Sequence, residues 1–273
     1  MKFSIKKRGD FSRQSFLGPN SQDVIERCVV GIVGLGGGGS HIAQQLAHLG
    51  FLNYVLFDKD KIEDSNLNRL VGGTEQDVIK GTLKVEIAKR TIRAIRPIAN
   101  VETHETAWQE NASALRRCDL VFGSLDGFDQ RRQLEIVTRR YLQPLIDVGM
   151  DVVEAGNGTV EIGGQVIVSM PDDLCMCCMG FLNERNLTAE AQKYGDAGPN
   201  PQVVWSNGVL ASTAVGHAVQ IITDWSKNRA PSRYLCYRGS TGALEPHVRL
   251  KYAPTTCTHF PLAKIGDPRP LTL

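Results

Sequence analysis

This sequence has no segment that reads as a membrane anchor or an export signal. Two stretches, Cys28 to Phe57 and Ala197 to Thr223, contain no Asp, Glu, Lys or Arg, but Gly, Asn, Gln, His and Ser interrupt both. Neither therefore predicts a transmembrane helix. The basic residues between Met1 and Asp10 are not followed by an apolar stretch, so no secretory signal is expected. We expect a cytoplasmic protein with reduced cysteines.

An excess of charge of either sign is also missing. The chain has 31 Lys and Arg against 29 Asp and Glu, for a formal net charge of +2. This balance argues against a nucleic-acid or membrane-surface partner. The motif G-x-x-x-x-G-K-[ST] does not occur, which excludes the ordinary P-loop kinases and ATPases. With 42% apolar and 22% charged residues, the composition is that of a globular protein.

Strand and helix patterns alternate as far as Met150. Apolar, β-branched runs predict the strands, and amphipathic spacing predicts the helices between them. The predicted strands are residues 28–33, 52–57, 101–106, 120–124 and 145–148, and the predicted helices are residues 40–49, 83–95 and 130–141. This alternation implies a parallel sheet with helices on both faces.

The pattern changes after Met150. Residues 160–170, 234–237 and 247–252 are strand candidates, and residues 209–225 predict a long helix. Trp205 and Trp225 bracket that helix and are expected to anchor it in the core. The expected α/β fold is a Rossmann-like parallel βαβ half continued by antiparallel strands into one mixed central sheet with helices on both faces.

We expect a single domain. Its parts are an N-terminal helical arm (1–27), a nucleotide-binding half (28–150) and a substrate-binding half (151–273) with a crossover loop at about 181–204.

A glycine loop follows the first predicted strand. The residues Gly34, Gly36, Gly37 and Gly39 lie in a G-x-G-x-x-G pattern directly before a helix, where backbone N–H groups can face a phosphate. Asp58 ends the next strand and can bind a ribose hydroxyl. A glycine turn used only for helix packing is the alternative.

Polar and cationic residues then favour ATP over a redox dinucleotide. Ser65, Asn66, Asn68 and Arg69 follow the second strand, and Lys84 begins the next helix, as binding of a triphosphate requires. Asp126 follows a later strand and suits Mg²⁺. For any one of these cations, a solvated surface charge is the alternative.

Together these residues resemble the ThiF/MoeB/HesA family of adenylating enzymes, the small bacterial form of the ubiquitin-activating superfamily. The resemblance also covers Phe11-Ser12-Arg13-Gln14, Asp58-Lys59-Asp60 and Gly208-Val209-Leu210. It implies an ATP site that includes Gly34, Gly36, Gly37, Gly39, Asp58, Asp60, Ser65, Asn66, Asn68, Arg69, Lys84, Asp126 and Gly127. It further implies that Lys84 holds the phosphates, that Asp126 binds Mg²⁺, and that Arg13 reaches the site of the other subunit of a homodimer. Arg13, Arg69, Lys84 and Asp126 would be the catalytic residues.

The implied activity is adenylation of the C-terminal glycine carboxylate of a ubiquitin-like or sulfur-carrier protein, with release of pyrophosphate. One alternative keeps the chemistry but activates a carboxylate on a modified tRNA base or a small peptide. Another is an ATP-binding scaffold without turnover. Leu70 and Gly127 depart from the Gln and Asn that are usual in the family, and each removes a polar contact.

Cysteines supply the last set of candidates. Relatives often bind zinc through two C-x-x-C pairs, and here Cys175 and Cys178 form one pair while Cys257 and His259 stand at the second. A Cys₃His zinc site is chemically reasonable, with packed thiols as the alternative and Cys236 as a substitute ligand.

The predicted crossover loop has no cysteine, which leaves Cys177 as the candidate nucleophile. Transfer of the acyl-adenylate to a separate thiol-bearing enzyme fits better. The basic pairs Arg131-Arg132 and Arg139-Arg140 predict a solvated helix face rather than a tRNA-binding one.

Overall fold

The computed structural model describes residues 10–155, 158–184, 187–188, 201–227, 229–260 and 266. Within these ranges we find no helix whose length and apolar character would let it cross a bilayer. Most of the predicted crossover loop lies outside the described residues. The proposed division of the chain into an arm and two halves stays a prediction.

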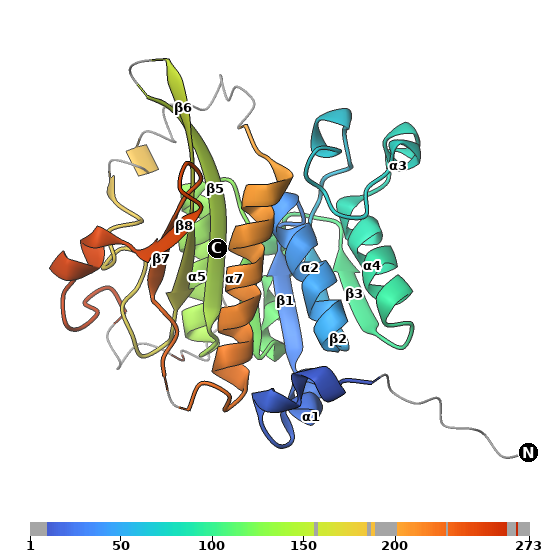
Figure 1. Ribbon diagram of the computed structural model, residues 1–273, viewed down its shortest axis with the longest axis horizontal. Helices are drawn as coiled ribbons and strands as arrows, with labels where there is room; N and C mark the ends of the chain where they lie inside the picture. The colour runs from blue at the N-terminus through green and yellow to red at the C-terminus, as the bar shows by residue number, and fades with distance from the viewer. Residues whose placement is uncertain are drawn as a thin grey trace, which may run out of the picture.

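One mixed sheet of eight strands forms the centre of the described structure, in the order β3-β2-β1-β4-β5-β6-β7-β8 (Figure 1). The strands are β1 (Val29–Val33), β2 (Asn53–Phe57), β3 (Asn100–His104), β4 (Leu120–Gly123), β5 (Leu145–Ala155), β6 (Thr159–Ser169), β7 (Tyr234–Arg238) and β8 (Ala243–Pro246). Strands β3 to β5 pair in parallel, and β5 to β8 pair antiparallel. The expected fold, a parallel half continued by antiparallel strands, is confirmed.

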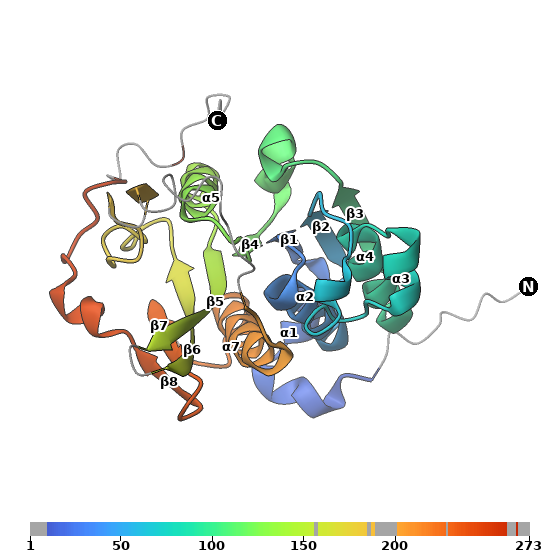
Figure 2. The same cartoon turned by 90° about the horizontal axis from the view of Figure 1, so that it is seen from above.

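Helices cover both faces of this sheet. The α-helices are α1 (Ser21–Arg27), α2 (Gly37–Leu49), α3 (Glu75–Lys80), α4 (Lys84–Ile95), α5 (Phe128–Arg140) and α7 (Val204–Ile222). The 3₁₀ segments are η1 (Ser12–Leu17), η2 (Asp64–Asn66), η3 (Trp108–Arg117) and η4 (Val248–Tyr252). Figure 2 shows α2, α4 and α7 on one face and α5 on the other.

The central strand β1 shows why the parallel half folds as it does. Its sequence Val-Val-Gly-Ile-Val lies between β2 and β4 and is buried on both faces, which explains a continuous apolar run without polar alternation. Val30 and Ile32 belong to the core beneath α2, while Val33 belongs to the core beneath η3. A Cβ atom at Gly31 would lie 3.0 Å from Leu115, so this glycine lets η3 pack closely.

The antiparallel half differs from the sequence prediction at two places. The predicted strand at residues 247–252 is wrong, because Pro246 ends β8 and the His247 side chain accepts a hydrogen bond from the Arg249 N–H, which starts η4 (3.1 Å). The core role predicted for Trp205 and Trp225 is also wrong, since these side chains are 57% and 44% exposed.

Small residues explain the packing of α7 instead. Helix α7 begins at Val204 and ends at Ile222, and its buried face is lined by Ala211, Ala214 and Ala218. Leu210, Val215 and Val219 are buried beside these alanines, so α7 packs against α2 and the sheet without either tryptophan. The sequence patterns also missed α3 and the continuation of β5 to Ala155, where it pairs with β6.

Candidate functional site

The carboxyl ends of β1, β2 and β4 meet at the upper edge of the sheet in Figure 1, because β1 pairs in parallel with both neighbours. The glycine loop follows β1, Asp58 follows β2 and Asp126 follows β4, so the structure brings these three predicted features to one edge. Ligands of open α/β sheets bind at such edges.

The glycine loop is shaped partly by packing and partly by open space. Gly34 has φ +89°, and a Cβ atom there would overlap the carbonyl oxygen of Ser124. A Cβ atom at Gly39 would likewise overlap the carbonyl oxygen of Gly34. Around Gly36, by contrast, no heavy atom of the described residues lies within 4 Å of a Cβ position. Packing thus accounts for Gly34 and Gly39, while Gly36 leaves room for a ligand at the start of α2.

Asp58 braces this loop. One carboxylate oxygen accepts a hydrogen bond from the Leu35 N–H (2.7 Å), and the other accepts one from the Asp60 N–H (2.9 Å). Burial raises the pKa of Asp58, and the nearby Lys84 opposes this rise. Each oxygen keeps a second lone pair, which is the capacity that a ribose hydroxyl would use.

Lys84 is held close to the loop by Asp60. It is the first residue of α4, its side chain is only 12% exposed, and its Nζ atom lies 3.1 Å from a carboxylate oxygen of Asp60. The Lys84 N–H also donates to the Asp60 carbonyl oxygen (3.0 Å). The ammonium group is therefore fixed at the sheet edge by an acid whose own side chain is 57% exposed.

The segment from Ser65 to Arg69 folds on itself. The buried Asn66 side chain accepts a hydrogen bond from the Glu63 N–H (3.2 Å), which makes it a helix cap for η2. The Arg69 guanidinium donates to the Ser65 carbonyl oxygen and to the Asn68 side-chain oxygen (3.0 Å). Asn68 in turn donates to the Gln202 carbonyl oxygen (3.0 Å), just before α7.

The two departures from the family pattern have different surroundings. Leu70 is buried and packs with Ile62 and Ile87 in a small apolar cluster. Gly127 precedes α5, and Asp126 beside it is exposed at the end of β4. An exposed carboxylate of this kind has the oxygen ligands that Mg²⁺ prefers.

Within a single chain, the predicted site residue Arg13 lies away from this edge of the sheet. It is exposed in η1, and η1 packs on the far end of α2, where the Gln14 side chain donates to the Leu49 carbonyl oxygen (2.9 Å). The 13 residues of α2 separate that end from the glycine loop, a length of about 20 Å.

Sequence reasoning missed three residues beside the edge. A Cβ atom at Gly37 would lie 2.5 Å from the Asn207 side chain, which lies in the first turn of α7 and is buried. Arg131 of α5 forms a buried ion pair with Asp147 of β5. Burial raises the pKa of Asp147, and Arg131 opposes this rise. The sequence signal for this ion pair was an acidic residue, Asp147, inside the apolar run Leu-Ile-Asp-Val.

The solvated-face prediction is wrong for two arginines of α5. Arg131 is 6% exposed and Arg139 is 1% exposed, because both point toward the sheet. Arg132 fits the prediction, since it is exposed and pairs with Asp129 one turn earlier (2.5 Å).

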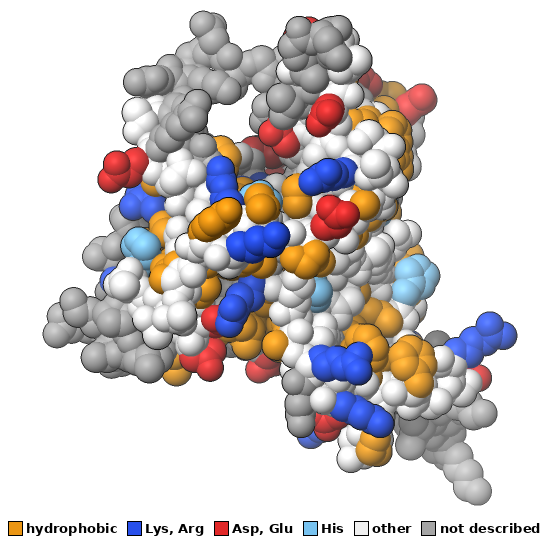
Figure 3. Space-filling model, turned by 60° about the vertical axis from the view of Figure 1, so that its left-hand side comes forward, with side chains coloured by type: hydrophobic (Ala, Val, Ile, Leu, Met, Phe, Trp, Pro, Cys, Tyr) orange, Lys and Arg blue, Asp and Glu red, His pale blue; other side chains and the backbone are white. Residues whose placement is uncertain are grey.

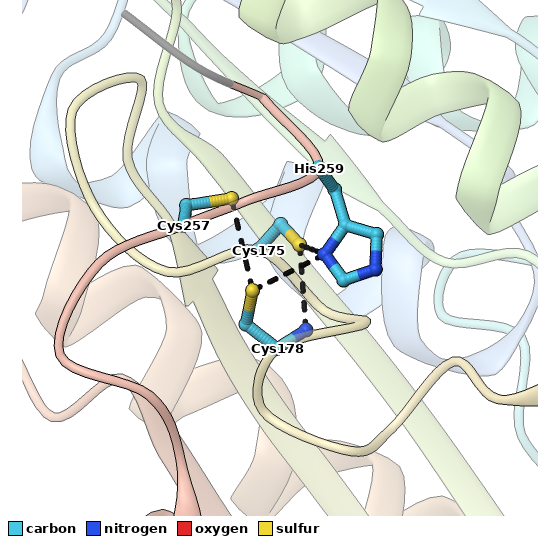
Figure 4. Close-up of side chains that lie close together, drawn as sticks. All are labelled: Cys175, Cys178, Cys257 and His259. Atoms are coloured by element: carbon cyan, nitrogen blue, oxygen red, sulfur yellow. Dashed lines mark hydrogen bonds between the residues drawn. The ribbon is translucent and has the colours of Figure 1, made fainter.

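Four metal-ligating side chains converge on the α5 face of the antiparallel strands (Figure 4). The Cys175 and Cys178 sulfurs lie 3.5 and 3.3 Å from the Nδ1 atom of His259, and the Cys178 and Cys257 sulfurs are 3.7 Å apart. Zinc bonds of about 2.3 Å to sulfur and about 2.0–2.1 Å to nitrogen give a tetrahedron with edges of about 3.8 Å and about 3.5 Å. The four side chains therefore fit a tetrahedral Zn²⁺ site.

The other two cysteine candidates lie outside this group. Cys236 belongs to β7, where it pairs with Gln165 of β6, so its role as a substitute ligand is wrong. Cys177 lies between Cys175 and Cys178 in the chain, is half-buried and packs against the apolar core beneath α5. Its role as a nucleophile stays a prediction.

Sequence comparisons point to one family. The ThiF family profile matches residues 11–259 of this chain. The chain is 28% identical over 169 residues to ubiquitin-like modifier-activating enzyme 5 of Drosophila willistoni, a match that covers 56% of this chain and 39% of that protein. It is 33% identical over 136 residues to the sulfur carrier protein adenylyltransferase of Thermus thermophilus, a match that covers 48% of this chain and 49% of that protein. The matched regions thus span less than half of these curated relatives.

Solved structures support the fold. The structure of E. coli MccB with succinimide superposes with a TM-score of 0.71 at 21% identity and covers 88% of this chain and 72% of MccB. At that identity the likeness concerns the architecture, a mixed sheet with helices around it.

Proposed function

This chain belongs to the ThiF family, and from that membership we propose that it uses ATP and Mg²⁺ to adenylate the C-terminal glycine carboxylate of a ubiquitin-like or sulfur-carrier protein. The observation that carries the proposal is one sheet edge with the open Gly36, the largely buried side chain of Lys84 and the exposed Asp126. The names of the two curated relatives support the class of substrate.

The glycine loop would bind the nucleotide. Backbone N–H groups at the start of α2 would face the phosphates through the open side of Gly36, with Gly34, Gly37 and Gly39 shaping the loop. Asp58 would accept hydrogen bonds from the ribose. Further contacts with ATP would come from Asp60, Ser65, Asn66 and Asn68. Asp126, next to Gly127, would bind the metal ion.

The reaction brings two anions together. A carboxylate oxygen of the acceptor attacks the α-phosphorus, a new P–O bond forms, and the bond from that phosphorus to the bridging oxygen breaks, so that pyrophosphate leaves with the electron pair. A terminal carboxylate is already ionised near neutral pH, so no general base is required. Lys84 and Arg69 would stabilise the charge that develops on the phosphates. Magnesium at Asp126 would neutralise phosphate charge.

A homodimer would complete the site. Arg13 lies at the far end of α2 from the loop of its own chain, so a catalytic contribution requires the partner subunit's Arg13. The arrangement would add one more cation next to the triphosphate.

The acyl-adenylate would then pass to another enzyme. The segment from Asn183 to Asn207 contains no cysteine, which favours a thiol supplied by a separate protein. The exposed Val204 and Trp205 are the first two residues of α7, beside the glycine loop, and would offer apolar contacts to the acceptor's extended tail.

The face in Figure 3 favours a protein over an RNA as a partner at that face. Basic and hydrophobic side chains are interspersed on it, and they do not form one continuous basic surface for an RNA backbone. A small peptide is the second candidate acceptor. MccB, whose fold is similar, has been solved together with MccA, and that second molecule motivates testing acceptors other than a ubiquitin-like protein.

The Cys175, Cys178, Cys257 and His259 cluster would hold a structural zinc ion. All four positions of a tetrahedron are filled by protein ligands, as in structural rather than catalytic zinc sites. The ion would join the loop after β6 to the segment after η4.

Pyrophosphate exchange into ATP tests the proposal. The enzyme is assayed with Mg²⁺ and, in separate reactions, a Gly-ended ubiquitin-like protein, a Gly-ended sulfur carrier, a small peptide, bulk tRNA or no acceptor. We expect exchange only with a Gly-ended protein, and its loss in Asp126→Asn. Asp129→Asn is the matched control, because that carboxylate lies in the first turn of α5 but is bonded to Arg132 and Gln133. Exchange with tRNA or a peptide alone would contradict the protein substrate.

A further inference from the structure

Two buried charged residues of α5 reach from the sheet to the loop that carries the first cysteines. Glu135 and Arg139 are one turn apart, and each side chain is 1% exposed. A Glu135 carboxylate oxygen accepts hydrogen bonds from the Met176 N–H (2.9 Å) and the Ser169 hydroxyl (2.6 Å). The residue that follows Cys175 is thus tied to α5.

Arg139 ties down the residues that precede Cys175. One terminal nitrogen of its guanidinium donates to the Leu174 carbonyl oxygen (2.9 Å), and the other donates to the Asp173 and Pro171 carbonyl oxygens (3.0 and 3.3 Å). Cys175 therefore lies between two residues whose backbones are held by opposite charges of the same helix.

The same guanidinium also contacts the second ligand-bearing segment. Its central carbon lies 4.9 Å from the ring centroid of Phe260, the residue that follows His259. Such a cation–π contact is directional. Arg139 thus touches a neighbour of Cys175 and a neighbour of His259, two ligands that are 84 residues apart in the chain.

We infer that Glu135 and Arg139 are positioning residues of the Cys175, Cys178, Cys257 and His259 metal centre. They fix the two ligand-bearing segments at the spacing that a tetrahedral ion requires. The inference rests on the metal site proposed above and is independent of the adenylation chemistry. Groups that orient metal ligands from behind commonly change metal affinity about 10- to 100-fold when they are removed.

The chemistry of the pair argues for this role rather than for core stability alone. A buried charged pair is often no more stabilising than apolar residues of similar volume. Here the two terminal nitrogens of Arg139 donate to three carbonyl oxygens of the loop, those of Pro171, Asp173 and Leu174, and an apolar residue could not hold those carbonyls. The pair determines the loop's conformation, which apolar packing of α5 would leave undefined.

Zinc release from the full-length protein tests the inference. Zinc-loaded wild type and Arg139→Met are mixed with a chromogenic chelator, and the release rate is followed. Arg140→Met is the matched control, because Arg140 is the next residue of α5 and is half-exposed. We expect release about 10- to 100-fold faster in Arg139→Met and unchanged in Arg140→Met. Phe260→Leu should accelerate release less, and its effect should not add fully to that of Arg139→Met.

A cobalt spectrum separates positioning from general stability. With Co²⁺ in place of Zn²⁺, the visible absorption reports the ligand geometry, and we expect it to change in Arg139→Met. If Arg139→Met does not fold, Arg139→Lys and Phe260→Leu provide the same two readouts. Release as slow as in wild type, an unchanged cobalt spectrum, or equal acceleration in Arg140→Met would each overturn the inference. A wild-type chain that binds no zinc would overturn it together with the metal site, while pyrophosphate exchange would remain a separate test of the adenylation.

Discussion

Replacing glycines of the loop one at a time should separate folding from ATP binding. In Gly34→Ala, a left-handed backbone costs about 1–2 kcal/mol, and the new methyl group would overlap the Ser124 carbonyl oxygen. Forcing extra volume into a packed site costs a further 1–3 kcal/mol, roughly. We therefore expect Gly34→Ala to lower the free energy of unfolding by about 2–5 kcal/mol, measured by urea denaturation.

Gly36→Ala should weaken ATP binding more than it weakens the fold. Gly36 has φ −71° and ψ −145°, outside the left-handed region, and the space around it is open. We therefore expect a smaller loss of unfolding free energy than in Gly34→Ala, about 1 kcal/mol or less. The methyl group would keep a phosphate from approaching the backbone, and the loss of one charge-assisted hydrogen bond predicts ATP binding about 10- to 100-fold weaker. Calorimetric titration with a non-hydrolysable ATP analogue and Mg²⁺ measures this.

Gly242→Ala is the control for backbone strain. Gly242 has φ +68°, and within the described residues nothing lies near its Cβ position. It should therefore lose only the cost of the left-handed backbone, about 1–2 kcal/mol, with unchanged ATP binding. Equal destabilisation by Gly36→Ala and Gly34→Ala, with ATP binding intact in Gly36→Ala, would refute the reasoning.

Three further predictions concern charged residues. Lys84→Met should slow pyrophosphate exchange by about 10²-fold. Lys89→Met should leave the rate unchanged, because Lys89 lies on the same helix but is paired with Glu86. Equal rates in both variants would count against the role of Lys84. The Arg90 guanidinium holds the pKa of Asp77 well below its usual range, so the ionised carboxylate stabilises the fold at neutral pH, and this stabilisation is lost as the pH falls below the unfolded-state value of 3.8. Asp77→Asn should thus cost about 1–3 kcal/mol at pH 7 in urea denaturation, and the difference from wild type should shrink in acid; a constant difference would contradict this. Pyrophosphate exchange should recover when inactive Arg13→Ala protomers are mixed with inactive Asp126→Ala protomers, because each mixed dimer contains one intact site. If mixed dimers are verified and activity does not recover, Arg13 does not act across the dimer.

The parallel half could be predicted because its signals are local. The run Val29–Val33, the glycines after it and Asp58 follow one another within a single βαβ unit. The crossover connection of such a unit is right-handed in nearly all proteins. The two cysteine-containing motifs could also be combined into one predicted metal site, because metal ligands must be close in space even when they are far apart in the chain.

The burial of Arg131 and Arg139 could not be predicted in the same way. Their partners Asp147 and Leu174 lie 16 and 35 residues away in the chain, and basic residues on a helix ordinarily mark its solvated face. The position of Trp205 was mispredicted for a related reason, because the core face of α7 is formed by its alanines together with Leu210, Val215 and Val219. These features depend on which elements pack together, which local patterns do not contain.

Transfer of radiolabel from ATP to an acceptor is the most direct test of the central claim. The full-length enzyme is incubated with Mg²⁺, a Gly-ended ubiquitin-like or sulfur-carrier protein, and ATP labelled at either the α- or the γ-phosphate. Adenylation predicts that the acceptor protein is labelled from α-labelled ATP alone, that label from the γ position appears in pyrophosphate, and that removing the acceptor's terminal glycine abolishes both. Labelling of the acceptor from the γ-phosphate, or release of inorganic phosphate without any labelled acceptor, would contradict the account.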